Sequence, residues 1–122
     1  MYDEYLVIEL KGYANSHFFR WGNKEESGKY EKETLGWFFR NTFPVAQKYY
    51  AHNPDNKKVK ACFITTAHFD KEAKEQLGQI GKGKLKSAYM EVAYDGKELY
   101  HKLKALKMPY EAEILKRYYL NR

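Results

Sequence analysis

The chain has 122 residues, with 22 basic and 16 acidic side chains and a formal net charge of +6. Apolar residues make up 43% and charged residues 31%, too apolar for a disordered segment and too polar for a membrane protein. The acidic start does not resemble a signal peptide, and the single cysteine, Cys62, cannot form an intramolecular disulfide, so a cytoplasmic protein is expected. Its basic surface favours polyanions such as nucleic acid as partners.

Hydrophobic periodicity predicts a single α/β domain over residues 1–122. The expected elements, in chain order, are a strand over 5–11, an ordered loop over 12–29, helices over 31–41 and 44–52, a strand over 58–65, a helix over 71–77 capped by Asp70, a basic loop over 78–86, a strand over 87–94, and helices over 99–106 and 110–118. Alternation along the first strand puts Leu6, Ile8 and Leu10 on one face. Helix-length crossovers between the strands imply a mixed or parallel sheet with helices on both faces.

Aromatic side chains gather in the loop and in the first helix. Phe18, Phe19, Trp21, Tyr30, Trp37, Phe38 and Phe39 are interleaved with Arg20 and Arg40. Such side chains can stack on unpaired bases, or they can pack the loop onto the sheet. The packing role is the one we favour.

The triplet Glu9–Leu10–Lys11 is the best chemical signal in the sequence. Residues two apart on a strand share a face, so the Glu9 carboxylate and the Lys11 ammonium group lie about 7 Å apart by strand rise. With the backbone carbonyl between them, the carboxylate can hold a hard cation such as Mg²⁺ or Mn²⁺. The lysine can orient water and stabilise charge on a phosphate. The alternative is an ordinary solvated strand face.

A second pattern begins at the end of the strand predicted over 58–65. It consists of Phe63, Ile64, Thr65 and Thr66, then Lys71, Glu72 and Ala73, then Asp95 and Gly96 ahead of Leu99, Leu103 and Leu106. Together with Glu9-x-Lys11, this order resembles the later half of the PD-(D/E)XK nuclease core, and more narrowly the Mrr-like restriction endonucleases, over residues 5–106. The resemblance implies a restriction-endonuclease-like mixed sheet flanked by helices, and a Mg²⁺-dependent DNA endonuclease. Glu9 would then ligate the metal, and Lys11 would be the catalytic lysine.

One part of that family's pattern is missing, namely an Asp on the strand before Glu-x-Lys and the helix ahead of it. Asp3 is predicted not to be this missing carboxylate, because an extended strand holds it about 20 Å from Glu9, and Glu4 fails for the same reason. The second carboxylate is therefore expected from residues absent from this chain, from a partner subunit or second copy, or from the helix carrying Glu31 and Glu33. Absent residues are favoured, which would make the chain a fragment of a longer domain that binds Mg²⁺ poorly by itself.

The basic loop carries Lys82, Lys84 and Lys86, which are predicted to hold the backbone phosphates of DNA without reading bases. Two non-enzymatic hypotheses stand beside the nuclease. One is a catalytically inactive nucleic-acid-binding or assembly module with the same fold. The other is a structural domain whose tyrosine-rich surface, with 12 Tyr in the chain, contacts protein. Nucleic-acid binding should weaken steeply with ionic strength, whereas an aromatic protein interface should not.

Overall fold

The computed structural model describes residues 3–13 and 18–120, and its centre is a parallel sheet of three strands in the order β1–β3–β5. The strands are β1 (Glu4–Lys11), β2 (Phe18–Phe19), β3 (Lys58–Thr65), β4 (His68–Phe69) and β5 (Ala93–Tyr94). The short strands β2 and β4 pair in parallel as a second small sheet. The prediction of an α/β architecture is confirmed.

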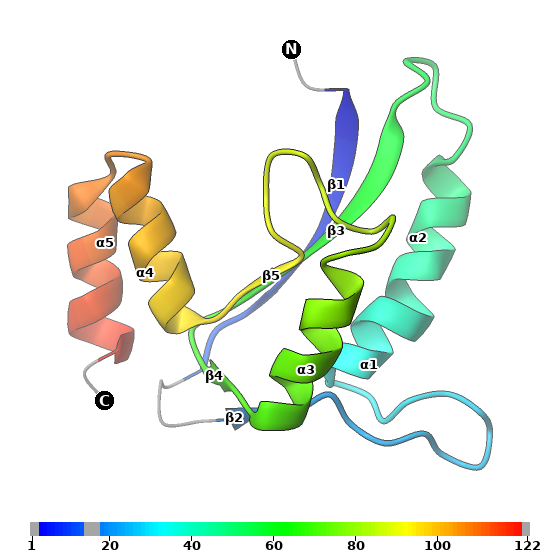
Figure 1. The fold of residues 1–122 in the computed structure, drawn as a ribbon, viewed down its shortest axis with the longest axis horizontal. Helices are drawn as coiled ribbons and strands as arrows, with labels where there is room; N and C mark the ends of the chain where they lie inside the picture. Colours follow the sequence, from blue (N-terminus) through cyan, green and yellow to red (C-terminus); the bar gives the residue numbers. More distant parts are fainter. Residues whose placement is uncertain (1–2, 14–17, 121–122) are drawn as a thin grey trace.

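Helices flank the sheet on both sides (Figure 1). They are α1 (Leu35–Trp37), α2 (Phe43–Tyr50), α3 (Lys71–Ile80), α4 (Gly96–Ala105) and α5 (Pro109–Leu115), with π-helical segments η1 (Phe38–Thr42) and η2 (Lys116–Leu120). In Figure 1, α1, α2 and α3 lie on one side of the sheet, and α4 and α5 lie on the other as a hairpin. In the part of the chain that the structure describes, no helix has the length and apolar character to cross a membrane.

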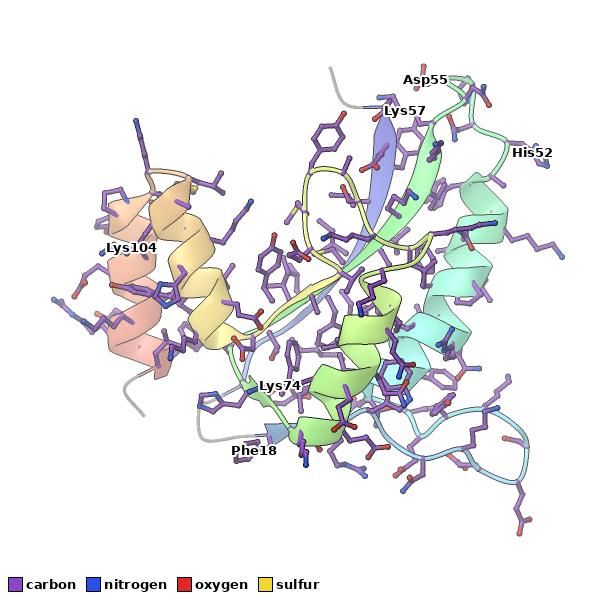
Figure 2. The ribbon with its side chains drawn as sticks, viewed as in Figure 1. Phe18, His52, Asp55, Lys57, Lys74 and Lys104 are labelled. Carbon is purple, nitrogen blue, oxygen red and sulfur yellow. The ribbon has the colours of Figure 1, made fainter. Side chains whose placement is uncertain are left out.

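The strand β1 pairs with β3 along its whole length. In the register, Glu9 lies beside Phe63 and Lys11 beside Thr65. Because register partners point to the same face of a sheet, Glu9 and Lys11 share the face that carries the core. The other end of β1 is held by the turn that follows α2, where the Tyr5 hydroxyl donates to Asp55 at 2.7 Å and the Lys57 ammonium group lies 5.3 Å from the Tyr5 ring centroid (Figure 2).

Aromatic side chains from the 18–43 region pack onto the centre of the sheet. Phe63 is 1% exposed, and its ring centroid lies 4.9 Å from that of Phe19 and 5.6 Å from that of Phe38. The residues of the aromatic cluster that are buried are Phe19, Trp21, Phe38 and Phe39. Phe18, in contrast, is 61% exposed. The packing role that the sequence favours for these residues is therefore confirmed for most of the cluster.

The first helix begins at Leu35, four residues later than predicted. Thr34 caps it, because its hydroxyl oxygen accepts a hydrogen bond from the Trp37 N–H at 3.2 Å, the usual role of Thr at this position. Glu33 has a φ of +61°, which no helical residue adopts. The expectation that a helix carries Glu31 and Glu33 is wrong.

Pro44 lies in the first turn of α2, as predicted, but the helical stretch before it does not stop. α1, η1 and α2 follow one another without a gap from Leu35 to Tyr50, and the Phe43 N–H donates to the Phe38 carbonyl, five residues back. Proline has no N–H, and its ring crowds the carbonyl four residues before it. A widened π turn just ahead of Pro44 accommodates both effects.

The strand predicted over 87–94 is wrong except for its last two residues, because side chains satisfy the backbone of the preceding segment. The Ala88 N–H donates to the Glu4 carboxylate at 3.1 Å, and the Glu91 N–H donates to the Tyr94 hydroxyl at 3.0 Å. Ser87 is buried and its hydroxyl also donates to Glu4. These bonds hold a loop where the hydrophobic pattern predicts a strand.

The Phe63→Ala substitution should lower the free energy of unfolding by about 3–5 kcal/mol, because it empties the centre of the aromatic core. Tyr110→Ala, at a side chain that is 74% exposed on α5, should change it by less than about 0.5 kcal/mol. Urea unfolding followed by tryptophan fluorescence measures both. Equal losses would show that the core is not centred on Phe63.

Candidate nucleic-acid and metal site

Glu9 and Lys11 form an ion pair near the carboxyl end of β1. The Lys11 Nζ lies 3.5 Å from the Glu9 Oε1. The Lys11 side chain is 26% exposed and the Glu9 side chain is 35% exposed. They share a face of one strand, as strand alternation requires. A carboxylate and an ammonium group are thus held together at a partly exposed position.

The two threonines that follow Phe63 and Ile64 fasten this end of the sheet. The Lys11 carbonyl accepts a hydrogen bond from the Thr66 N–H at 3.3 Å. The Thr66 hydroxyl accepts from the Tyr13 N–H at 2.8 Å and donates to the Tyr13 carbonyl at 2.5 Å. The Thr65 hydroxyl accepts from the Ala67 N–H at 3.1 Å. Thr66 therefore fixes the backbone at Lys11 and at Tyr13, on the side of β1 that faces β3.

The donor atoms beside Lys11 suit a hard cation. Since the Lys11 carbonyl points toward β3, strand alternation turns the Leu10 carbonyl toward the open side of β1. The Glu9 carboxylate and this carbonyl are oxygen donors of the kind that Mg²⁺ prefers, but Mg²⁺ takes six ligands. Among the described residues no group of three or more His, Cys, Asp or Glu side chains could hold a metal. The residues fit the metal but leave its protein ligand set incomplete.

Asp3 and Glu4 lie at the opposite end of β1 and are bound there. The Glu4 carboxylate holds Ser87 and Ala88, and the Tyr89 hydroxyl donates to Asp3 at 3.0 Å, which raises the pKa of the Tyr89 phenol. The strand is unbroken from Glu4 to Lys11. Neither carboxylate can approach Glu9 of the same chain.

Glu31 is also committed elsewhere. Its carboxylate accepts hydrogen bonds from the Asn23 N–H at 2.8 Å and from the Arg20 guanidinium at 3.1 Å. The Asn23 N–H, and after it Arg20, hold the pKa of Glu31 below its usual value. The carboxylate therefore organises the loop before α1.

The predicted phosphate-binding lysines lie on the exposed loop between α3 and β5. Lys82 and Lys86 line a groove of about 420 Å³ together with Lys58 and Lys60. The Lys60 ammonium group donates to the Lys84 carbonyl at 2.6 Å. Lys86 is paired with Glu91 at 3.2 Å. These contacts place four basic side chains around one surface depression.

The lysine loop and the Glu9–Lys11 pair lie toward opposite ends of β1. The groove beside the loop also includes Asp3 and Glu4, and Glu4 precedes Glu9 by five residues of strand, which is about 16 Å. The structure therefore does not bring the two predicted sites together.

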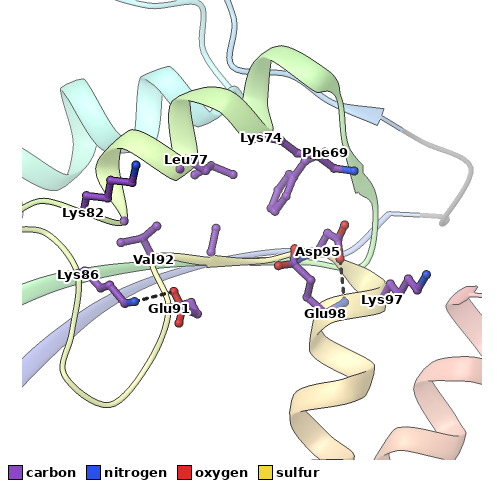
Figure 3. Close-up of a pocket in the computed structure, with 13 residues that line it drawn as sticks. Phe69, Lys74, Leu77, Lys82, Lys86, Glu91, Val92, Asp95, Lys97 and Glu98 are labelled. Atoms are coloured by element: carbon purple, nitrogen blue, oxygen red, sulfur yellow. Dashed lines mark hydrogen bonds and ion pairs between the residues drawn. The ribbon is translucent and has the colours of Figure 1, made fainter.

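A larger cavity lies on the other side of the loop, between α3 and the start of α4 (Figure 3). It measures about 600 Å³, and its charged lining residues are Lys74, Lys82, Lys86, Glu91, Asp95, Lys97 and Glu98. Figure 2 shows Lys74 on α3. Asp95 and Glu98 form the capping box of α4. Sequence reasoning missed Lys74 and Lys97, because they come from separate segments and no local motif joins them to the loop.

Cys62 is fully buried, and burial raises the pKa of its thiol to about 11. A neutral buried thiol is a poor nucleophile and a poor metal ligand. This residue belongs to the packing of β3.

Comparison of the chain with family models, with curated protein sequences and with solved structures finds no match. The geometry of Glu9 and Lys11 and the motif residues themselves are therefore the features that indicate a function.

The Glu31→Gln substitution should destabilise the protein at neutral pH, because Gln cannot offer the charged carboxylate that Asn23 and Arg20 bind. A carboxylate whose pKa is lowered in the folded state contributes stability above its unfolded pKa and loses it as the pH falls through the folded pKa. The difference between wild type and variant should therefore be largest near pH 7 and vanish well below pH 4.5. Urea midpoints measured from pH 7 to pH 3 test this, and a pH-independent difference would contradict it.

Proposed function

We propose that this chain carries the later half of a PD-(D/E)XK nuclease core, of restriction-endonuclease-like fold, that hydrolyses phosphodiester bonds in DNA with Mg²⁺ or Mn²⁺. The observation that carries the proposal is the ion pair of Glu9 and Lys11, with 3.5 Å between charged atoms, on one half-exposed strand face. Its setting adds support, because the pair stands near the carboxyl end of a strand in a parallel sheet. Open α/β sheets gather their active-site groups at that edge.

Glu9 and Lys11 have complementary roles in this proposal. Glu9 would supply a carboxylate ligand, and Leu10 its backbone carbonyl. The bound metal would act as a Lewis acid on the phosphate. The Lys11 ammonium group would orient the attacking water and stabilise the negative charge that develops on the phosphate oxygens. Its position beside Glu9 keeps that positive charge within reach of a metal-bound phosphate.

The lysine loop can serve the same substrate despite its distance from Glu9. A separation of about 16 Å corresponds to about five base pairs, at 3.4 Å each. A duplex that lies along β1 would therefore present different phosphates to the two ends of the strand. The lysines would position the DNA, and Glu9 and Lys11 would act on the scissile bond.

A binding module without catalysis is the second candidate function. The observation that favours it is that no second carboxylate joins Glu9 in a metal-binding group among the described residues, while four lysines surround the groove at the other end of β1. Such a module would hold DNA through phosphate contacts alone and would show the same salt dependence.

In any preparation of the protein that cuts DNA, Lys11→Ala should abolish cutting and leave the fold and the bulk DNA affinity nearly unchanged. The reason is that one ammonium group acts at the scissile phosphate, whereas many contacts hold the duplex. Plasmid nicking with Mn²⁺ or Mg²⁺ and circular dichroism are the measurements. Lys104→Ala, an exposed lysine on α4, is the matched control. Wild-type nicking by Lys11→Ala would remove the nuclease proposal.

Replacing Lys82, Lys84 and Lys86 together by Ala should weaken binding to all DNA sequences alike. The slope of log K against log salt should flatten by up to ~3 units, about one for each phosphate that a lysine no longer neutralises. Fluorescence anisotropy with duplex DNA at several salt concentrations measures the slope. Replacement of Lys102, Lys104 and Lys107 removes the same charge from the end of α4 and the turn that follows it, and should leave the slope nearly unchanged. Equal slopes for the loop variant and wild type would mean that the loop is a solvated turn.

A further inference from the structure

The strand that carries Glu9 and Lys11 lies at the edge of the sheet, and no described strand pairs with its outer side. It is eight residues long and contains no proline. Its side chains Ile8 and Leu10 are 46% and 69% exposed. A groove of about 600 Å³ runs beside it, lined by residues 4–7 and by Tyr50 of α2. A long edge strand with exposed apolar side chains and unpaired backbone groups is a template for another strand.

The backbone groups available at this edge follow from the bonds to β3. The Asp3 carbonyl accepts from the Lys58 N–H, and the Lys11 carbonyl accepts from the Thr66 N–H. Since successive residues of a strand point in opposite directions, the odd-numbered residues bond to β3. The even-numbered residues, Glu4, Leu6, Ile8 and Leu10, present their N–H and C=O groups to the open side. An added antiparallel strand would therefore form its closely bonded pairs at these four positions.

We propose that a second copy of this chain adds to the edge, with the two β1 strands antiparallel about a two-fold axis at Val7, and that Asp3 of the partner subunit completes the carboxylate pair at Glu9. This inference rests on the proposed function and names the missing ligand. It selects the partner subunit, one of the sources of the second carboxylate that the sequence leaves open.

Charge selects the register of the two strands. A pairing centred on Leu6 would set Asp3 opposite the partner's Glu9. A pairing centred on Glu9 would set Glu9 opposite the partner's Glu9. Like charges directly opposite each other are destabilising. A pairing centred on Ile8 joins no opposite charges, and centres nearer the ends leave much of the strand unpaired. The register centred on Val7 pairs the strand from Asp3 to Lys11.

In this register each Lys11 lies opposite the partner's Asp3, and each Glu9 lies opposite the partner's Tyr5. The odd-numbered pairs are not directly hydrogen-bonded, so their Cα atoms are about 4.5 Å apart and their side chains are close. Glu9 and the partner's Asp3 are then diagonal neighbours on one face, about 7–8 Å apart. Carboxylates at that spacing can both reach one cation whose ligands lie at ~2.1 Å.

Asp3 is suited to this role by its exposure and its charge. It is exposed, and its carboxylate is bound by the neutral Tyr89 hydroxyl. No ion pair to Asp3 occurs among the described residues. Its negative charge is therefore available to the partner's Lys11 and to a cation beside it.

The helix α2 fits the same arrangement. It contacts both β1 and β3, and its residue Tyr50 lines the groove beside residues 4–7 of β1. Val45, Tyr49 and Tyr50 are 71%, 80% and 47% exposed in one chain. The second copy gives these large apolar side chains a surface to cover.

The oligomeric state in solution tests the pairing without any reference to activity. Sedimentation equilibrium should show a dimer for wild type and for Ile8→Val, and a monomer for Ile8→Pro. The Ile8 N–H faces the open side, so proline removes no bond to β3 and should leave the circular dichroism of the fold in place. A monomeric wild type, or a folded Ile8→Pro variant that remains a dimer, would overturn the inference.

A charge exchange keeps the test valid if Ile8→Pro fails to fold. Asp3→Lys should weaken the dimer at least tenfold, because two lysines then face each other. The double variant Asp3→Lys with Lys11→Asp should restore it. If the double variant dissociates as readily as the single one, the register centred on Val7 is wrong.

Mixing two variants tests whether the metal site is shared. Asp3→Asn and Glu9→Gln should each bind Mn²⁺ at least tenfold more weakly than wild type in calorimetry. In an equimolar mixture about half of the dimers are mixed, and each mixed dimer has one intact pair, so roughly a quarter of the wild-type sites should return. A mixed dimer that regains no binding would overturn the shared site. A wild-type dimer that binds no Mn²⁺ would overturn both the shared site and the metal role in the proposed function. A wild type that is monomeric would overturn the shared site but not the proposed nuclease function.

Discussion

The parallel pairing of β1 with β3 is the constraint on which the geometry of the site depends. It sets Glu9 beside Phe63 and Lys11 beside Thr65, so the charged pair is held at the rim of the aromatic core. A slip of one residue would turn both charged side chains to the opposite face. The core resists such a slip, because Phe63 is almost fully buried among the rings of the 18–43 region and β4. The packing that buries Phe63 at the centre of the sheet therefore also keeps Glu9 and Lys11 on their face of β1.

Local signals in the sequence were sufficient for much of the fold. The strands over 5–11 and 58–65 are dense in β-branched and aromatic residues, and Asp70 caps α3 as expected, accepting from the Ala73 N–H at 2.8 Å. The predictions were wrong where side-chain hydrogen bonds, and not hydrophobic periodicity, decide the local structure. The Glu4 carboxylate binds the Ser87 hydroxyl and the Ala88 N–H, 83 and 84 positions away. No periodicity within 87–94 predicts those contacts. The start of the first helix depends on Thr34, a residue that the hydrophobic pattern does not mark.

Some features of the candidate site likewise follow from local sequence, whereas others depend on the tertiary structure. The shared face of Glu9 and Lys11 follows from the period of a strand and needs no tertiary information. The distance from this pair to the lysine loop depends on which end of β1 the loop approaches, and that is a property of the crossover through α3. The contribution of Lys74 and Lys97 to a common cavity likewise depends on the placement of two helices. Strand period therefore sufficed to place Glu9 beside Lys11, whereas the grouping of side chains from separate elements required the tertiary structure.

The pairing of β1 with β3 joins residues far apart in the chain, since Glu4 lies beside Lys58, 54 positions later. Contacts of such long sequence separation form late in folding. At ~5–20 residues per second, several seconds of synthesis separate the appearance of the two strands. During that interval the segment YLVIEL has neither its neighbour nor its core, and its composition is typical of aggregation-prone strands. The long sequence separation between β1 and β3 therefore also creates a period in which the β1 segment of the nascent chain is exposed to aggregation with other chains.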